Sequence, residues 1–196
     1  MARANHKQSS NQLRIIGGQW RSRKLSFPDV QGLRPTPDRV RETLYNWLAP
    51  TIAGAHIIDV FAGSGALFLE GLSRGAASGL AIELDRHACH SLQQNLRTLN
   101  CTNARVVQEN ALSFLARPAE QSYDIALLDP PFHQDLLLES CHLLEQQGWL
   151  KPDAWIYTES EQAPSMLAVP QSWRLHREKH AGLVYYALWH RTPPTQ

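Results

Sequence analysis

Apolar and polar positions alternate along this chain with two periods, and the period changes repeatedly between residues 56 and 159. Five short apolar runs rich in β-branched residues predict strands, and the stretches between them, with apolar residues three or four apart, predict helices. We expect strands at residues 56–60, 79–84, 104–108, 123–128 and 154–159, and helices at 66–74, 86–99, 111–116 and 135–147. Nearly continuous apolar strands that alternate with helices are typical of a parallel sheet covered on both faces. The predicted fold is therefore doubly wound α/β.

The C-terminal part departs from this alternation. Residues 173–178 and 183–190 are strand-like runs, and only the segment His180-Ala181-Gly182 lies between the charged end of the first and the start of the second. That spacing leaves no room for a helix. We therefore expect an antiparallel hairpin at the sheet edge, which gives a mostly parallel sheet of seven strands.

The N-terminal part predicts a small β-hairpin followed by a helix. Gly17-Gly18 lies between short apolar runs and indicates a hairpin turn. Further along, Thr36 fits a helix N-cap and Pro37 the first helical position. Apolar residues then recur every three or four positions over residues 40–48, which is typical of an amphipathic helix.

Length and composition fit a folded protein with one main domain. The chain has 196 residues, of which 43% are hydrophobic and 19% charged, unlike a disordered chain or a disulfide scaffold. We divide it into an extension, residues 1–50, and a main domain, residues 51–196. The longest apolar run, residues 183–189, is too short to span a bilayer, and the first residues lack an apolar signal core. We expect a cytoplasmic protein that binds no membrane and acts as a monomer.

The cysteines and histidines do not indicate a metal site. The three cysteines are isolated and show no Cys-x-x-Cys spacing, which favours reduced thiols over disulfides or a zinc finger. The nine histidines show no His-Glu-x-x-His motif. We expect no metal.

The near-neutral total charge conceals an uneven distribution. The formal net charge is +1, but the first 47 residues hold nine Lys and Arg against three Asp and Glu, so they carry +6 and the remainder −5. A basic segment on a mildly acidic body suggests a polyanionic partner, because cations that contact phosphates release condensed counterions. A solvated terminal tail is the alternative, and it explains Arg3 and Lys7 equally well. The candidate nucleic-acid contacts are Arg14, Arg21, Arg23, Lys24, Arg34, Arg39 and Arg41.

A glycine loop follows the first strand of the main domain. The segment Asp59-Val60-Phe61-Ala62-Gly63-Ser64-Gly65 allows a sharp turn and the close approach of a ligand, although a purely structural strand-to-helix turn is the alternative. A complete dinucleotide fingerprint would have a third glycine at Phe68. S-adenosylmethionine has no phosphate and tolerates a looser loop, so this departure favours S-adenosylmethionine.

Polar residues after the next two strands could complete such a cofactor site. Glu83 ends the second strand, where a carboxylate can accept hydrogen bonds from ribose hydroxyls. Asn110 follows the third strand and could bond the adenine edge, and Asp59 could face a cationic amino group. The expected cofactor site consists of Asp59, Ala62, Gly63, Ser64, Gly65, Glu83, Asn110 and Ala111.

The segment Asp129-Pro130-Pro131-Phe132 carries the most specific signal in the chain. It follows an apolar strand directly, and its two prolines fix the backbone and donate no hydrogen bonds. Asp129 and the Pro130 carbonyl therefore form an array of acceptors suited to an exocyclic amino group, and Phe132 offers a face on which a base can stack. A proline-stiffened loop with an incidental aspartate is the alternative.

These motifs resemble the S-adenosylmethionine-dependent methyltransferases that modify exocyclic amino groups of bases. The stretch from Arg34 to Glu42, with Asn46-Trp47-Leu48 and the preceding segment from Arg14 to Trp20, is similar to the RsmD family of bacterial 16S rRNA guanine-N2 methyltransferases. The resemblance covers residues 14–190. It implies a Rossmann-like class I methyltransferase fold.

The resemblance also implies a function. The chain is expected to methylate N2 of one guanine of 16S rRNA, guanine 966 in the family's usual rRNA numbering, on an assembled or assembling 30S subunit. Asp129 to Phe132 would grip the guanine, and the basic extension would engage the rRNA. A DNA adenine-N6 methyltransferase is the nearest alternative, because the same acceptors suit either amino group. A noncatalytic rRNA-binding assembly factor is the alternative of another class.

Overall fold

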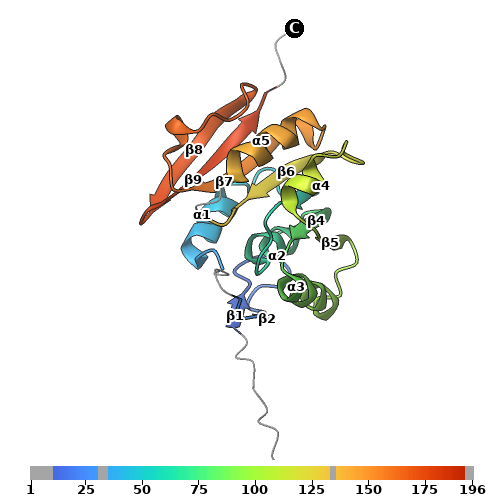
Figure 1. Cartoon of the computed structure of the whole chain (residues 1–196). Helices are drawn as coiled ribbons and strands as arrows, with labels where there is room; N and C mark the ends of the chain where they lie inside the picture. The colour runs from blue at the N-terminus through green and yellow to red at the C-terminus, as the bar shows by residue number, and fades with distance from the viewer. Residues whose placement is uncertain (1–10, 31–34, 133–135, 193–196) are drawn as a thin grey trace, which may run out of the picture.

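The computed structural model describes residues 11–30, 35–132 and 136–192, and a seven-stranded sheet forms its centre (Figure 1). The strands lie in the order β5-β4-β3-β6-β7-β9-β8; β3 to β7 run parallel, and β9 is antiparallel to both of its neighbours. Their bounds are β3 His56–Asp59, β4 Ser78–Glu83, β5 Ala104–Gln108, β6 Tyr123–Leu128, β7 Leu150–Ser160, β8 Trp173–Ala181 and β9 Val184–Arg191. The predicted mostly parallel sheet with an antiparallel C-terminal hairpin is confirmed.

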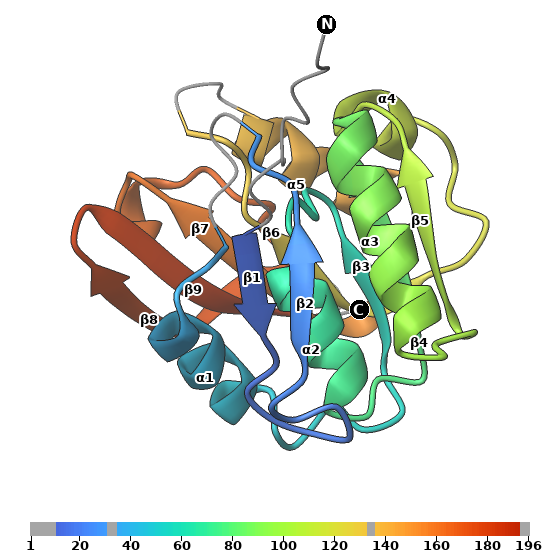
Figure 2. The same cartoon turned by 90° about the horizontal axis from the view of Figure 1, so that it is seen from below.

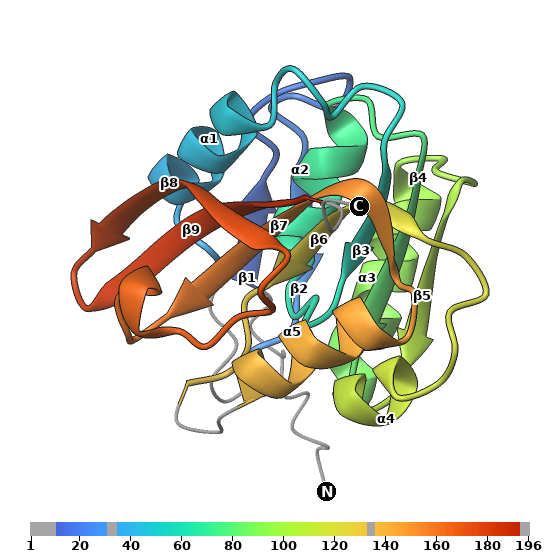
Figure 3. The same ribbon diagram turned by 90° about the horizontal axis from the view of Figure 1, so that it is seen from above.

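Helices cover both faces of this sheet. The helices α1, α2 and α3 lie on one face and α4 and α5 on the other (Figures 2 and 3). Their bounds are α1 Asp38–Trp47, α2 Ala66–Ser73, α3 Arg86–Thr98, α4 Ala111–Leu115 and α5 Leu136–Gln146, and a short 3₁₀ helix covers Pro164–Met166. Because side chains alternate along a strand, Ile57 belongs to the core on the α2 side and Ile58 to the core on the α5 side. The doubly wound prediction is confirmed.

The N-terminal β-hairpin packs over the helices rather than joining the sheet. It consists of β1 Asn11–Arg14 and β2 Lys24–Phe27, paired antiparallel, and it lies against α2 and α3 (Figure 2). Its inward-facing residues, Leu13, Leu25 and Phe27, are buried in the same core as α1 and α2. The hairpin is thereby an integral part of the folded body.

Gly17 and Gly18 do not form the tight hairpin turn that the sequence predicted. The loop between the strands spans residues 15–23, and Gly18 has a φ of +76°. A Cβ atom on Gly18 would lie 1.8 Å from the carbonyl oxygen of Ser73, and the neighbouring Gln19 N–H donates to that same oxygen at 2.8 Å. The reason for glycine here is the close approach of the loop to the end of α2.

The start of α1 also differs from the prediction. The helix begins at Asp38 with Pro37 at the N-cap position, and no side chain caps it. The Thr36 hydroxyl donates instead to Asp129 Oδ2 at 3.2 Å, and the Thr36 carbonyl accepts from Arg41 Nε at 3.2 Å. Thr36 is therefore not the N-cap. It connects α1 to the loop that follows β6.

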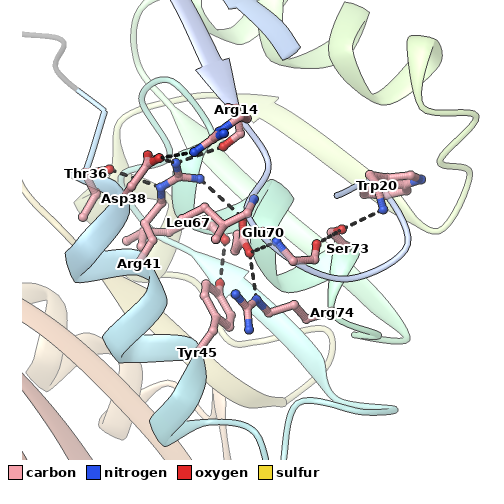
Figure 4. Close-up of polar contacts among 12 residues, drawn as sticks. Arg14, Trp20, Thr36, Asp38, Arg41, Tyr45, Leu67, Glu70, Ser73 and Arg74 are labelled. Carbon is pink, nitrogen blue, oxygen red and sulfur yellow. Dashed lines mark hydrogen bonds and ion pairs between the residues drawn. The ribbon is translucent and has the colours of Figure 1, made fainter. Parts of the chain in front are cut away.

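Arg41 corrects one of the proposed nucleic-acid contacts. Its side chain is fully buried, and its guanidinium donates to Asp38 Oδ1 at 2.5 Å, to the Arg14 carbonyl at 3.0 Å and to Glu70 Oε2 at 3.4 Å (Figure 4). A guanidinium occupied in this way has no face left for a phosphate. Arg41 joins α1, the hairpin and α2, and the prediction that it contacts RNA is wrong.

Glu70, the buried partner of Arg41, holds the hairpin loop as well. Its two oxygens accept the backbone N–H groups of Ile16 and Gly17, each at 2.9 Å, and Arg74 Nε donates to Oε1 at 2.7 Å (Figure 4). A buried carboxylate is stable only when its lone pairs are satisfied by such donors. The loop therefore has a fixed position against α2.

Candidate active site

The carboxyl ends of the parallel strands bring together most of the predicted site. The ends of β3, β4 and β6 carry Asp59, Glu83 and Asp129, and the end of β7 adds Glu159. In an open α/β sheet, ligands bind beyond the carboxyl ends of the strands, at the point where the strand order reverses. Asp59, Asp129 and Glu159 each follow an α2-side core residue by two positions, namely Ile57, Leu127 and Tyr157, so all three carboxyl groups lie on that face.

The glycine loop and Glu83 are in direct contact. The Gly63 N–H donates to Glu83 Oε2 at 2.6 Å, and the Asp85 N–H donates to Glu83 Oε1 at 2.7 Å. Gly63 and Gly65 have φ values of +53° and +78°, so both need the freedom of glycine. Gly65 is also the N-cap of α2, and Ala62 and Ser64 are buried beside it. The turn and the carboxylate thus form one rigid unit.

Phe68 replaces a fingerprint glycine without disturbing this loop. Its ring is fully buried, and a Cβ atom on Gly79 of β4 would lie 2.5 Å from Phe68 Cε2. A fingerprint glycine at position 68 would place the small residue on the helix. Here the small residue is Gly79 on the sheet, and the large Phe68 ring of α2 packs closely against it.

Asn110 serves as the N-cap of α4. Its Oδ1 accepts the Ser113 N–H at 3.0 Å, and the following Ala111 is buried. Asn110 itself is exposed at the carboxyl end of β5. Its contact with adenine stays a prediction, and the capping bond leaves the amide nitrogen and one lone pair of Oδ1 for such a contact.

Asp59 is a buried carboxylate with an unpaired oxygen. Within the described part of the chain, Asp59 Oδ1 has no hydrogen-bond partner. Burial raises the pKa of Asp59 well above its usual range, and the negative charges of Asp129 and Glu83 add to that effect. An unpaired buried oxygen of this kind fits a cationic donor supplied by a ligand, such as the amino group of an amino-acid moiety.

Asp129 lies between the end of β6 and the start of α1. Its carboxylate accepts the Thr36 hydroxyl, and burial raises its pKa to about 6. Pro130 is buried, whereas Pro131 and Phe132 are exposed, with 42% of the Phe132 surface accessible. Asp129 is thus a fixed carboxylate, and an aromatic ring beside it faces solvent.

Glu159 and Tyr157 are site residues that the sequence analysis did not identify. Leu128 and Thr158 are register partners, so Asp129 and Glu159 follow on adjacent strands. Tyr157 donates its hydroxyl to Glu159 Oε1 at 2.8 Å, and burial together with the charge of Asp129 raises the pKa of Glu159 to about 8. The signal was the glutamate that ends the predicted strand at 154–159, but its relevance depends on β6 and β7 being neighbours.

The remaining candidate nucleic-acid contacts divide into two groups. Arg14 and Arg39 are exposed near the start of α1, and Arg14 lies 3.5 Å from Asp38 Oδ2. Arg21 and Arg23 are exposed in the hairpin loop, and Arg23 donates to the Thr98 carbonyl at the end of α3.

The two groups adjoin at the loop end of the hairpin, because Arg14 is the register partner of Lys24, the residue that follows Arg23. Lys24 is exposed at the start of β2. Arg34 lies outside the described residues.

The described residues offer neither a metal site nor a membrane-spanning helix. Over residues 11–30, 35–132 and 136–192, no group of three His, Cys, Asp or Glu side chains could hold a metal ion. His176 and His180 are four residues apart, but they lie on strand β8. No helix in the same ranges is long and apolar enough to cross a membrane.

Comparison with known proteins places the chain among rRNA methyltransferases. Residues 13–190 match the family described as "Conserved hypothetical protein 95". The chain is 56% identical over 191 residues to "Ribosomal RNA small subunit methyltransferase D" of Escherichia coli strain K12, which covers 97% of this chain and 96% of that protein.

Solved structures agree with this relationship. The structure of the Escherichia coli methyltransferase yhhF has a TM-score of 0.86 and 53% identity, and the match covers 93% of this chain and 99% of that one. A 16S rRNA N2 G1207 methyltransferase of Thermus thermophilus, solved with AdoMet and guanosine, has a TM-score of 0.69. At 22% identity, over 93% of this chain and 50% of that one, the second likeness concerns the fold alone.

Proposed function

Because the chain belongs to the family of ribosomal RNA small subunit methyltransferase D, the RsmD family, we propose that it methylates a guanine of 16S rRNA. The methyl group comes from S-adenosylmethionine and is transferred to the exocyclic N2, at guanine 966 in the family's usual rRNA numbering. The substrate is an assembled or assembling 30S subunit. The observation that carries the proposal is the meeting of buried Asp59, with its unpaired oxygen, and Asp129 on one face of the sheet edge.

The residues at the carboxyl edge fit S-adenosylmethionine. Asp59 Oδ1 lacks a donor within the described chain, and the α-ammonium of the methionine moiety would supply one. Gly63, Ser64 and Gly65 would lie along the cofactor, and Glu83 would accept hydrogen bonds from its ribose. Asn110 would contact adenine through its side-chain amide. When bound, the cofactor supplies an electrophilic methyl group on a sulfonium.

Asp129 and the Pro130 carbonyl hold the amino group of the guanine. The lone pair of N2 is delocalised into the purine ring, so two acceptors that fix its N–H bonds orient the nitrogen for attack. One N–C bond forms as the methyl–sulfur bond breaks, and N2 then loses one proton. With a pKa of about 6, Asp129 is mostly ionised at neutral pH and can accept that proton. Phe132 offers its exposed ring for stacking.

The rRNA would extend from this edge along the hairpin. Arg39 lies in the first turn of α1, which follows Thr36, and Arg14, Arg21 and Arg23 lie at the loop end of the hairpin. Exposed guanidinium groups that follow a surface in this way suit a phosphate backbone. The basic extension therefore acts as the RNA-binding surface of the enzyme.

One experiment separates this proposal from its alternatives. The protein is incubated with labelled S-adenosylmethionine and 16S rRNA, either free, protein-bound or in intact 30S subunits, and the nucleosides are then analysed. We expect N2-methylguanosine from one site. Methylated adenine would favour the alternative of an adenine-N6 methyltransferase. The absence of product with all three substrates would favour a noncatalytic assembly factor.

A further inference from the structure

Glu159 lies beside the proposed guanine site without having any part in the mechanism above. It is 7% exposed and stands at the end of β7, next to Asp129 at the end of β6. Burying a carboxyl group costs free energy unless its oxygens have hydrogen-bond partners. The inference that follows rests on the proposed function.

The surroundings of Glu159 hold it in one position. Tyr157 is fully buried and donates its hydroxyl to Glu159 Oε1. The ring of Tyr157 contacts that of Tyr186 with a centroid distance of 6.5 Å, and Tyr186 stacks on Trp47 of α1 at 5.7 Å. Because Trp47, Tyr186 and Tyr157 pack against one another, the Tyr157 hydroxyl has a fixed position, and the carboxyl group bonded to it has little freedom to rotate.

Glu159 can still form hydrogen bonds with a ligand. In the described part of the chain, Oε1 receives the Tyr157 hydroxyl and Oε2 has no hydrogen bond. At neutral pH the group is mainly neutral, because burial and the charge of Asp129 raise its pKa to about 8. A neutral carboxyl group donates through one oxygen and accepts through the other, on which one lone pair is still free.

We propose that Glu159 is a specificity-determining residue that recognises the N1–H and O6 edge of the target guanine. If Asp129 and Pro130 hold N2, the next ring atom on the side of O6 is N1, which carries a hydrogen in guanine and a lone pair in adenine. Glu159 accepts the N1–H and donates to O6, which gives two hydrogen bonds. Adenine presented by its N6 offers N1 as an acceptor and a C–H beyond it, so only one bond can form. Glu159 thereby favours guanine.

The test uses 16S rRNA in which the target guanine is replaced by 2-aminopurine, which keeps the amino group but lacks N1–H and O6. We expect the wild-type protein to prefer guanine in kcat/KM by about 10- to 100-fold, because unpaired buried polar groups penalise the analogue. Glu159→Ala should bring that ratio close to one. Glu159→Gln, which retains one acceptor and one donor, should keep most of it. An unchanged ratio in Glu159→Ala would overturn the inference.

A second variant covers the case in which Glu159→Ala does not fold. Tyr157→Phe removes one hydroxyl and should lower the guanine preference several-fold by releasing Glu159, whereas a preference equal to wild type would contradict the inference. Glu178→Ala, on strand β8, which β9 separates from β7, is the matched control for Glu159→Ala and should leave the ratio unchanged. Failure of the wild-type protein to methylate guanine at all would refute the proposed function itself, which is a different result.

Discussion

Three carboxyl groups on one face of the sheet edge determine the chemistry at the scale of single residues. Asp59 and Glu159 are buried and Asp129 is half-buried, and the negative charge of Asp129 acts on both of the others. Burial and mutual repulsion both favour the neutral forms. As a result, Asp129 and Glu159 titrate close to neutral pH rather than near 4.

The first prediction is a bell-shaped pH dependence of kcat/KM. Activity should rise as Asp129 ionises near pH 6 and fall as Glu159 loses its proton near pH 8. The other groups that face Glu159 are Tyr186 and Tyr157, and burial raises the pKa of Tyr157 well above its usual range; Asp59 faces Asp129. Glu159→Gln should remove the descending limb and retain the ascending one. A descending limb that persists in Glu159→Gln would assign it to another group.

The second prediction concerns Asp129. Asp129→Ala removes the acceptor that orients the amino group, so methyl transfer should fall by at least about 100-fold. Binding of S-adenosylmethionine, measured by calorimetry, should change little, because the predicted cofactor residues lie on β3, β4 and β5. Near-wild-type turnover would exclude the proposed role. Asp124→Ala is a suitable control, since Asp124 pairs with Lys151 at the other end of β6.

At the scale of elements, the docking of the hairpin loop on α2 is the most demanding contact. The third prediction is that Gly18→Ala destabilises the protein by about 2 to 4 kcal/mol, because the methyl group meets the Ser73 carbonyl and the backbone has a positive φ. Gly54→Ala is the matched control: its φ is +78° and a Cβ atom there would meet nothing within 4 Å. It should cost about 1 kcal/mol. Urea unfolding measures both, and equal losses would contradict the docking argument.

The fourth prediction tests the hairpin as a phosphate-binding element. Arg21→Ala combined with Arg23→Ala should weaken rRNA binding and reduce the slope of log K against log salt by about 1.4 to 1.8, the share of two phosphate contacts. Arg174→Ala with Arg177→Ala removes the same charge from the exposed strand β8 and serves as the control. If the hairpin pair leaves the salt slope unchanged, Arg21 and Arg23 do not contact phosphates.

Element types could be predicted from the sequence because they depend on local periodicity. The strand predicted at residues 123–128 has those bounds in the structure, and the helix predicted at 86–99 ends one residue earlier. The role of Glu159 could not be predicted, since it depends on which strands are neighbours. The burial of Arg41 could not be predicted either, because its partner Glu70 lies 29 residues further along the chain.

At the scale of the whole molecule, the uneven charge distribution acquires a spatial meaning. The described part of the +6 segment is not a separate arm, since the hairpin and α1 share one core with the sheet. Its exposed arginines run from the start of α1 to the loop end of the hairpin, whereas the buried acidic residues of the described chain are Asp59, Glu70 and Glu159. The total of +1 therefore conceals a cationic surface on the hairpin and α1, and this surface is the part of the charge distribution that bears on RNA binding.

The contact between Arg41 and Glu70 also constrains the order in which the chain can fold. Synthesis proceeds from the N-terminus, so β1, β2 and α1 exist before residue 70 has been added. Until Glu70 arrives, α2 is incomplete, and the Arg41 guanidinium has Asp38 and the Arg14 carbonyl as partners but lacks its buried carboxylate. The hairpin loop likewise needs Glu70 and Ser73 for its backbone hydrogen bonds. The segment that is made first is therefore fixed in place only after the centre of the sheet has begun to form.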